Sequence, residues 1–337
     1  MLFLKKRIII YSAVVIIFFA AGIYLARFVL PDGKQTINRT RIVMGTVAEI
    51  KIIYKNGEVS NQAINSAFKE IKRIEKLFST YDQKSPIWEI NHSDKIKIKL
   101  NDELYNFIQI NDSLWKLTNG AFDPSLGSLT IAWGFNTDNP LIPSQKKLNI
   151  ALANSGWKNI EISDKEIIKK KNIQLDFGSI AKGYAVDRAI DIIKSFGIKK
   201  ALVNIGGEVK GIGRNWKVGI KHPRIVNLLL YKIKLNNYGV ATSGDYEKYF
   251  FENGKRYSHI FNPLNGYPAN SVRSVSVINK SVMFADALST ACFVLAPIEG
   301  IKLINKLPDT EGLIIDKNGN EFKSKGFDDF REESKFM

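Results

Sequence analysis

The strongest constraint on this 337-residue chain is an uncharged run of 19 residues from Ile8 to Ala26, preceded by three basic residues (5–7) and closed by Arg27. A helix of this length can span a bilayer. The basic flank comes first, so the positive-inside rule places the N-terminus in the cytoplasm. The alternatives are a cleaved signal, whose apolar region is usually only about 7–15 residues, and a buried core helix. We predict a membrane anchor or signal segment at 1–30, with the rest of the chain on the periplasmic side of the inner (plasma) membrane.

Cysteine and charge exclude several classes of protein. The single Cys292 cannot form an intramolecular disulfide or a Cys-based zinc finger, and it lies far from an N-terminal lipid-attachment site. The chain carries 49 Lys and Arg against 33 Asp and Glu, a net charge of +16. Four of those basic residues lie in 1–27, which hold no acid, and the rest are dispersed. Nucleic-acid binding would need a concentrated basic patch with interleaved aromatic residues, so we predict no nucleic-acid partner.

The remainder predicts an α+β fold with mixed or antiparallel sheets and packed helices, because many short strands follow one another with few helices between them. We expect a tether at 31–40, the folded domain at 41–320 and a charged, partly disordered tail at 321–337. The expected elements are a strand or strand pair at 41–54, a helix capped by Ser60, a helix capped by Asn101 or Asp102, a loop at 136–147, a strand at 172–176 leading into a helix at 179–195, short strands over 199–278, helices at Ser281–Leu295 and 299–307, and a strand at 311–316. Glycines 206, 207, 211 and 213 predict a hairpin turn rather than a dinucleotide loop, because no helix follows them.

Two clusters combine an acid with hydroxyls. Asp176, Ser179 and Lys182 stand where the expected strand runs into a helix, and backbone N–H groups at a helix start attract phosphate. Alternatively, Asp176 or Ser179 only caps the helix and Lys182 is solvated. Asp286 and Thr290 are four residues apart and share a helix face, where Mg²⁺ would satisfy both. Alternatively, Thr290 bonds to its own helix and Asp286 meets a lysine.

The other candidates are a histidine and scattered aromatic residues. His259 lies between an expected strand and a tight turn, a placement that suits a general base, although a lone histidine is more often structural. Tyr81 and Phe122 could stack on a planar ring system, or belong to the core.

Taken in order, these clusters resemble the ApbE-type FAD:protein FMN transferase family. The resemblance covers roughly residues 40–316. The matching stretches are 44–46, 79–81 with Ser85 and Asn91, 120–124, 176–184, 204–207, 241–245, 258–266 and 285–291. Two departures are an apolar segment in place of the lipid-bearing cysteine of many members, and Asn262 where an Asp is common.

The resemblance implies Mg²⁺-dependent transfer of FMN from FAD to a Thr hydroxyl of a target redox flavoprotein, such as a subunit of an ion-pumping electron-transfer complex, with release of AMP. His259 would activate the acceptor hydroxyl. The residues implied to contact FAD are Met44, Tyr81, Ala121, Phe122, Asp123, Asp176, Lys182 and Ile260. The residues implied to hold the metal are Ser179, Asp286, Ser289 and Thr290. Two alternatives stay open: some relatives hydrolyse FAD to FMN and AMP, and others mainly bind it.

Overall fold

The computed structural model describes residue 33 and residues 35–170 and 172–332. The expected anchor at 1–30 and the end of the expected tail lie outside these described residues. The helices are α2 (Gly57–Phe78), α3 (Pro86–His92), α4 (Asp102–Leu117), α5 (Gly127–Ala132), α6 (Gln145–Ala153), α7 (Ala181–Ser195) and α8 (Val282–Ile304), with 3-10 helices η1 (Trp157–Asn159) and η2 (Phe327–Phe330). The strands are β1 (Gln35–Val43), β2 (Thr46–Tyr54), β3 (Lys97–Lys99), β4 (Ile160–Ser163), β5 (Glu166–Lys169), β6 (Ala201–Ile205), β7 (Glu208–Ile212), β8 (Trp216–Lys221), β9 (Leu229–Leu235), β10 (Tyr238–Gly244), β11 (Tyr249–Glu252), β12 (Lys255–Ser258), β13 (Val272–Asn279), β14 (Glu311–Asp316) and β15 (Glu321–Lys323).

The centre of the molecule is an eight-stranded sheet in the order β1-β2-β6-β7-β10-β13-β14-β15, in which neighbouring strands are antiparallel. A three-stranded sheet (β3-β5-β4) and the hairpins β8–β9 and β11–β12 complete the strand content of the described residues. The predicted α+β fold with antiparallel sheets and packed helices is therefore confirmed.

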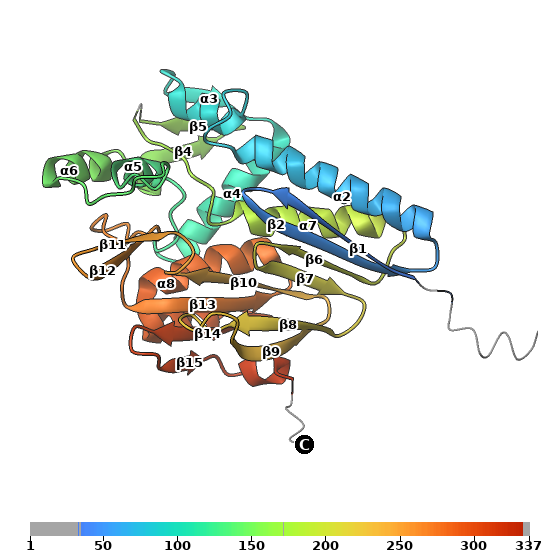
Figure 1. Ribbon diagram of the computed structural model, residues 1–337. Helices are drawn as coiled ribbons and strands as arrows, with labels where there is room; N and C mark the ends of the chain where they lie inside the picture. The colour runs from blue at the N-terminus through green and yellow to red at the C-terminus, as the bar shows by residue number, and fades with distance from the viewer. Residues whose placement is uncertain (1–32, 34, 171, 333–337) are drawn as a thin grey trace, which may run out of the picture.

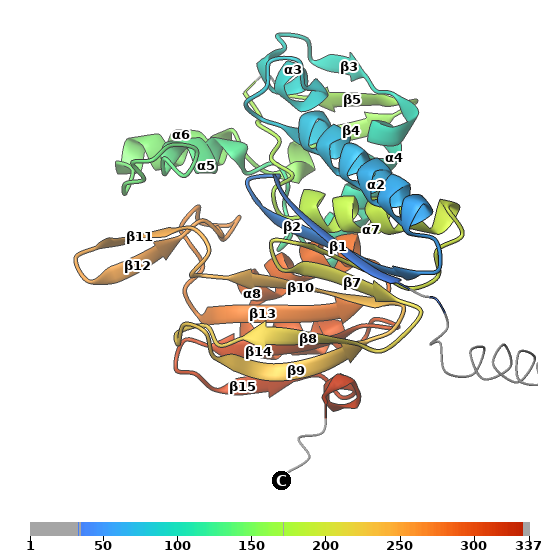
Figure 2. The ribbon, with the colours of Figure 1, turned by 45° about the vertical axis from the view of Figure 1, so that its right-hand side comes forward.

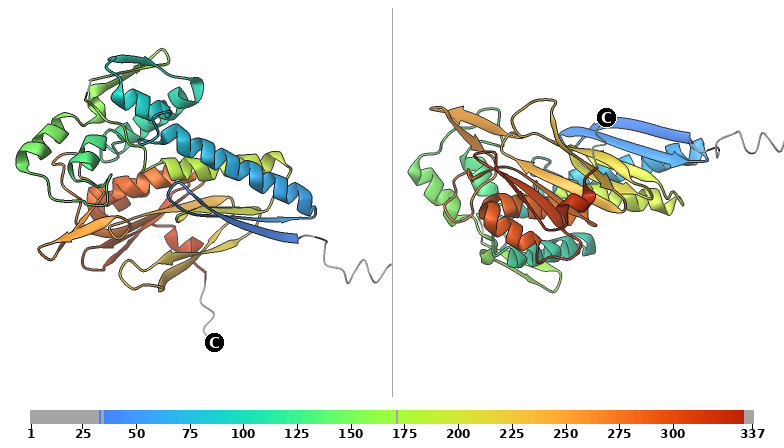
Figure 3. Two further views of the ribbon diagram at one scale, coloured as in Figure 1. Left: turned by 45° about the horizontal axis from the view of Figure 1, so that its top comes forward. Right: turned by 90° about the horizontal axis from the view of Figure 1, so that it is seen from below.

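Both faces of the main sheet are covered. Helices α2, α7 and α8 pack on one face and the β8–β9 hairpin lies over the other (Figure 1 and Figure 3). Because side chains alternate along a strand, neighbouring residues serve different cores. In β14, Ile314 belongs to the large core under the helices, whereas Leu313 and Ile315 belong to a smaller core with Ile233 of β9 and Phe327 of η2.

Helix α8 is apolar enough, by length and composition, to cross a membrane. It nevertheless packs against β10, β13 and α7, and most of its residues from Val282 to Phe293 are buried there. At Ala296, followed by Pro297, the backbone leaves the helical region and kinks α8. The predicted helices at Ser281–Leu295 and 299–307 are therefore the two arms of one kinked core helix.

Three expected boundaries are wrong. Strand β1 begins at Gln35, because Gln35–Thr40 pair with β2 rather than forming a tether. Residues 321–332 are folded, since β15 pairs with β14 and the Phe327 side chain is fully buried. Helix α2 is capped by Asn56, whose side chain accepts the N–H groups of its first turn, and not by Ser60.

The expected strand at 172–176 is not a strand. The segment pairs with no ladder, and Asn172 lies in a turn. Instead, the Asn91 side chain of α3 accepts the Leu175 N–H at 2.7 Å and donates to the Leu175 carbonyl at 2.9 Å. A side chain from another part of the chain thus satisfies backbone groups that a neighbouring strand would otherwise satisfy.

Candidate active site

Two hairpin turns at one end of the main sheet carry candidate site residues. The β1–β2 turn places Met44 at a positive φ of 51°, and its N–H donates to the Glu75 carboxylate at 2.7 Å. The predicted hairpin turn between β6 and β7 is confirmed, with Gly206 and Gly207 at φ 66° and 115°. Glu208 follows this turn directly and points its carboxylate into the protein, where it is 2% exposed.

The first turn of α7 packs directly against α8. A Cβ at Gly183 would lie 2.5 Å from the Val282 carbonyl oxygen, so only glycine permits the approach. The Gly183 N–H donates to the Asp286 carboxylate at 2.9 Å. The neighbouring Lys182 forms an ion pair with Glu208 across the site. Lys182 therefore has a carboxylate partner, whereas one of the two interpretations of its motif left it only solvated.

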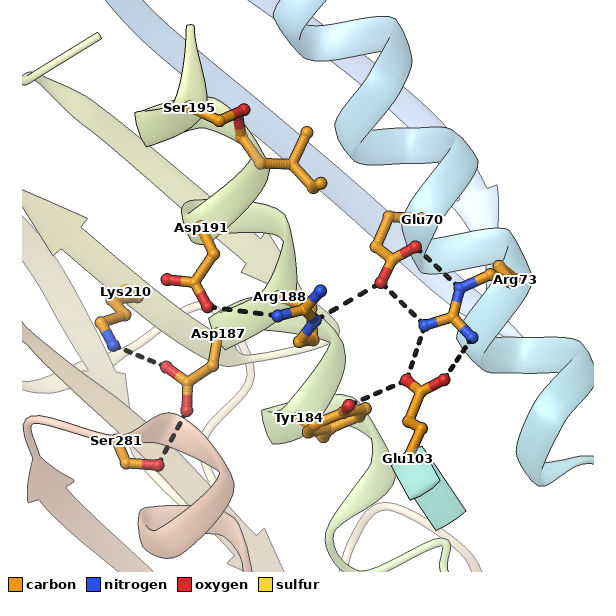
Figure 4. A network of polar contacts seen from close by, with 11 residues as sticks. Glu70, Arg73, Glu103, Tyr184, Asp187, Arg188, Asp191, Ser195, Lys210 and Ser281 are labelled. Carbon is orange, nitrogen blue, oxygen red and sulfur yellow. Dashed lines mark hydrogen bonds and ion pairs between the residues drawn. The ribbon is translucent and has the colours of Figure 1, made fainter. Parts of the chain in front are cut away.

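Polar contacts on two sides hold α7 in this position (Figure 4). On one side Asp187 accepts from Lys210 of β7 and from Ser281 beside α8. On the other side Tyr184 donates to Glu103 of α4 at 2.9 Å. Arg73 of α2 also binds Glu103, so that Glu103 joins α2, α4 and α7 in one network.

The ionisable groups around Lys182 change one another's pKa values. Burial alone would lower the pKa of the Lys182 ammonium, but the carboxylates of Glu208, Asp286 and Glu247 outweigh burial and hold it above its ordinary value. Burial, with Glu208 beside it, raises the pKa of Asp286 to about 7. One carboxylate oxygen of Glu208 is buried without a hydrogen bond in the described part of the chain. The site therefore holds three acidic side chains around Lys182, one of them with a buried oxygen that has no hydrogen bond within the described residues, an arrangement that suits a further cation.

Hydroxyl groups lie next to Asp286. Ser289 donates to the Asp286 carbonyl at 2.8 Å, and Ser243 of β10 contacts Ser289 at 2.7 Å and Thr290 at 3.2 Å. Since Ser289 gives its only hydroxyl proton to that carbonyl, Ser243 is the donor to Ser289 and Thr290 is the donor to Ser243. The lone pairs of Thr290 stay available, whereas Ser289 is fully buried and supports the helix backbone. The geometry thus favours Thr290, not Ser289, as a metal ligand; Ser179, in the turn before α7, is half-buried.

His259 has one defined tautomer. Its Nδ1 lies 3.2 Å from the Lys248 carbonyl oxygen, which only accepts, so Nδ1 carries the proton and Nε2 has a free lone pair. Burial lowers the pKa of His259 to about 4; the hydrogen bond to Lys248 opposes this, and the positive charges of Lys248 and Lys182 add to it. The ring is therefore neutral at neutral pH and is a competent proton acceptor.

A cavity of about 710 Å³ opens beside these groups, within the size range of small-molecule sites. Its lining includes Tyr81, Phe135, Glu247 and Lys248. Tyr81 is 68% exposed, so its ring is available for stacking. Burial and the negative charge of the nearby Asp176 raise the pKa of the Tyr81 hydroxyl.

Several residues expected to contact FAD lie in the core or stabilise a loop. The Phe122 side chain is fully buried in the large core, so the expected stacking of its ring on a ligand is wrong. The Asp123 carboxylate accepts from the Ser125 and Trp157 N–H groups at 2.9 and 3.0 Å, which fixes its loop. Ala121 and Ile260 are buried at 8% and 6% exposure. Asp176 did not prove to cap α7, since its Oδ1 accepts from the Gly178 N–H.

Sequence reasoning missed Glu208, Ser243 and Glu247. The only local signal for Glu208 is an acid directly after a Gly-Gly turn, and the pairing of Ser243 with α8 depends on the order of strands in the sheet.

A half-buried lysine among carboxylates, a neutral imidazole and an adjoining cavity are the features of an enzyme site. The model of the ApbE family matches residues 44–314. A curated relative from Vibrio cholerae named "FAD:protein FMN transferase" is 31% identical, and the match covers 85% of this chain and 90% of that protein. Among solved structures, the ApbE protein of Thermotoga maritima is 35% identical with a TM-score of 0.83, covering 89% of this chain and all of that one. The Pseudomonas stutzeri flavinyl transferase ApbE is 30% identical with a TM-score of 0.79, covering 88% and 97%. The chain is an enzyme and belongs to the ApbE family.

Proposed function

We propose that this enzyme transfers FMN from FAD to a Thr hydroxyl of a target flavoprotein and releases AMP. The observation that carries the proposal is the neutral His259, with Nε2 free, beside the Lys182–Glu208–Asp286 cluster. The names of its relatives and the match to the family model support the flavin chemistry.

The residues present fit a bound Mg²⁺. No group of three or more His, Cys, Asp or Glu side chains that could hold a metal is formed among the described residues. Mg²⁺ commonly uses one or two carboxylates together with substrate phosphates, so Asp286, Thr290 and the backbone near Ser179 would suffice as its protein ligands. When bound there, the ion would neutralise charge on the pyrophosphate.

The residues of this chain then have separate tasks. Nε2 of His259 accepts the proton of the target Thr hydroxyl while the Thr oxygen attacks the phosphorus of the FMN half. The bond between that phosphorus and the bridging oxygen breaks, and AMP leaves with the bridging oxygen and its negative charge. Lys182, held by Glu208, keeps a positive charge near that phosphate. Met44, Tyr81, Asp176 and the 121–123 and 260 backbones would hold FAD.

The location follows from the sequence. Residues 8–26 would retain the enzyme in the inner membrane with its domain on the periplasmic side, where exported redox proteins are the target class.

The test is a labelling reaction. The detergent-solubilised chain, FAD, Mg²⁺ and a target flavoprotein with an acceptor Thr are expected to give a fluorescent target band that survives denaturing electrophoresis, with AMP in equal amount. His259→Gln should bind FAD but lose at least 100-fold in labelling rate, because general-base catalysis contributes about 10²–10⁴-fold. His92→Gln is the matched control, since His92 stacks on Trp88 and bonds to the Trp88 carbonyl, both within α3.

Other outcomes contradict the proposal. AMP released equally fast without target, with no flavin on protein, would make the chain an FAD hydrolase. Neither AMP nor labelling would leave only FAD binding. Labelling by His259→Gln at the normal rate would exclude His259 as the base, and Asp286→Asn with unchanged Mg²⁺ dependence would exclude the metal site.

A further inference from the structure

The two ends of the main sheet are chemically different. Strands β6 and β7 pair Ile205 with Glu208 at the active-site end and Ala201 with Ile212 at the other end. Strand β1 likewise begins opposite Tyr54 and reaches Met44 only after nine residues. The chain therefore joins the sheet at the end remote from the turns at Met44 and Glu208, and Figures 1 and 2 show β1 beginning on the side of the molecule opposite β11 and β12.

That remote end carries a group of basic side chains, which we call the basic end: Lys55, Lys194, Lys199, Lys200 and Arg214. The Lys200 carbonyl accepts from the Ile53 N–H at 3.0 Å, two residues before Lys55. Gly213, next to Arg214, lies against the Lys199 backbone, and Lys194 lies at the C-terminal end of α7. Lys200 is half-buried and the other four are exposed.

The charge of the basic end is largely unneutralised. Within the described residues, none of its five side chains takes part in an ion pair. The acids at this end of the sheet include Glu58, Asp191 and Asp309. Asp191 already lies 3.7 Å from Arg188, and Asp309 lies 2.9 Å from Lys280. Exposed cations held together without counter-ions attract an anionic surface.

The connection to the apolar segment fixes which surface is in reach. Only eight residues, 27–34, separate Ala26 from Gln35, and at most about 3.5 Å per residue they extend no more than about 28 Å. Strand β1 itself is nine residues long, about 30 Å, so the active-site end cannot easily turn to the bilayer while the basic end can.

We propose that the basic end lies against the anionic lipid headgroups of the membrane that holds residues 8–26, so that the active site faces away from the bilayer. This rests on the membrane anchor of the proposed function. Electrostatic attraction falls off within a Debye length of about 8 Å at physiological salt, so the contact is close and weakens at high salt. The target's acceptor Thr is thereby met at a distance from the membrane rather than at its surface.

The experiment uses the full chain in vesicles. Cys292 is buried, so a single new cysteine takes a fluorophore selectively. The fluorophore is placed at Asn215→Cys in the basic end or at the exposed Ile150→Cys on α6, on the opposite side of the molecule. With a headgroup-linked quencher in vesicles containing 30% phosphatidylglycerol, we expect at least threefold stronger quenching at position 215.

Charge variants give the decisive comparison. Lys199→Gln, Lys200→Gln and Arg214→Gln together should abolish the difference, as should 0.5 M salt or pure phosphatidylcholine. The control with the same charge change, Lys146→Gln, Lys147→Gln and Lys158→Gln, should leave it intact. Equal quenching at both positions, or quenching unaffected by lipid charge, overturns the proposal, as would capture of an acidic protein in place of lipid. Flotation of the vesicles tests the membrane anchor separately from the activity. A chain that does not float with the vesicles refutes both the anchor and this orientation, whereas the proposed FMN transfer is tested by the labelling reaction.

Discussion

At the scale of single residues, His259 links stability to pH. Its pKa in the fold is lowered to about 4 by burial, while an unfolded chain protonates histidine near 6.5. Between these two pH values His259 is protonated in the unfolded state but stays neutral in the folded state. The free energy of unfolding therefore falls as pH falls from about 6.5 to about 4. Above 6.5 both states are neutral and the effect vanishes.

The comparison of the wild type with His259→Gln isolates this contribution. Glutamine can still donate to the Lys248 carbonyl but does not titrate. We expect urea unfolding to show that the wild type loses more stability than the variant between pH 7.5 and 4.5. Equal losses would mean that the ring is solvated in the fold.

Single-residue roles were predictable where a short pattern carries them. Asp286 and Thr290 share a face because they are four apart, and the structure keeps them together beside Ser243. Glu208 could not be predicted in this way. Glu208 matters because its buried carboxylate forms an ion pair with Lys182, which lies 26 residues earlier in the sequence. Neither the burial nor the pairing is visible in the local sequence.

At the scale of elements, the segment around Leu175 depends on Asn91. Replacing Asn91 by Ala leaves the N–H and the carbonyl of the fully buried Leu175 without partners. Each unsatisfied buried group costs about 1–3 kcal/mol, so we expect a loss of about 3 kcal/mol in the free energy of unfolding, measured in urea. Asn149→Ala on the exposed face of α6 is the control, and its effect should stay within about 0.5 kcal/mol. A similar small effect for Asn91→Ala would contradict this account.

The same segment shows what limits prediction of elements. The apolar alternation of 172–176 predicts a strand, but it cannot show which groups the backbone bonds to. The partner lies 84 residues earlier in the sequence and is a side chain, not a strand. The helices α2, α4 and α7 were predictable because their buried faces recur at helical spacing.

At the scale of the whole molecule, the main sheet has a core on each face, and the chain after residue 320 closes the smaller one. Composition misleads here: the charged residues of 321–337 predict a tail, yet Phe322 and Phe327 pack inward between them. The order of strands along the chain does not predict this smaller core either, because β8 and β9 do not join the main sheet but form a separate hairpin that covers it.

Phe327→Ala tests whether this second core contributes to the stability of the whole domain. Phe327 is fully buried with Ile233, Leu235 and Leu313, so its truncation should cost about 3–5 kcal/mol. Phe330→Ala is the matched control, because Phe330 packs only partly against the same core and should cost less than half as much. If 321–332 were a loosely attached tail, both variants would unfold at the wild-type urea concentration. If the two faces of the sheet fold as one unit, Phe327→Ala instead lowers the urea concentration of a single unfolding transition, even when that transition is monitored at the active site. The reason is that both cores share the strands of the main sheet, so losing packing in the smaller core weakens the larger one.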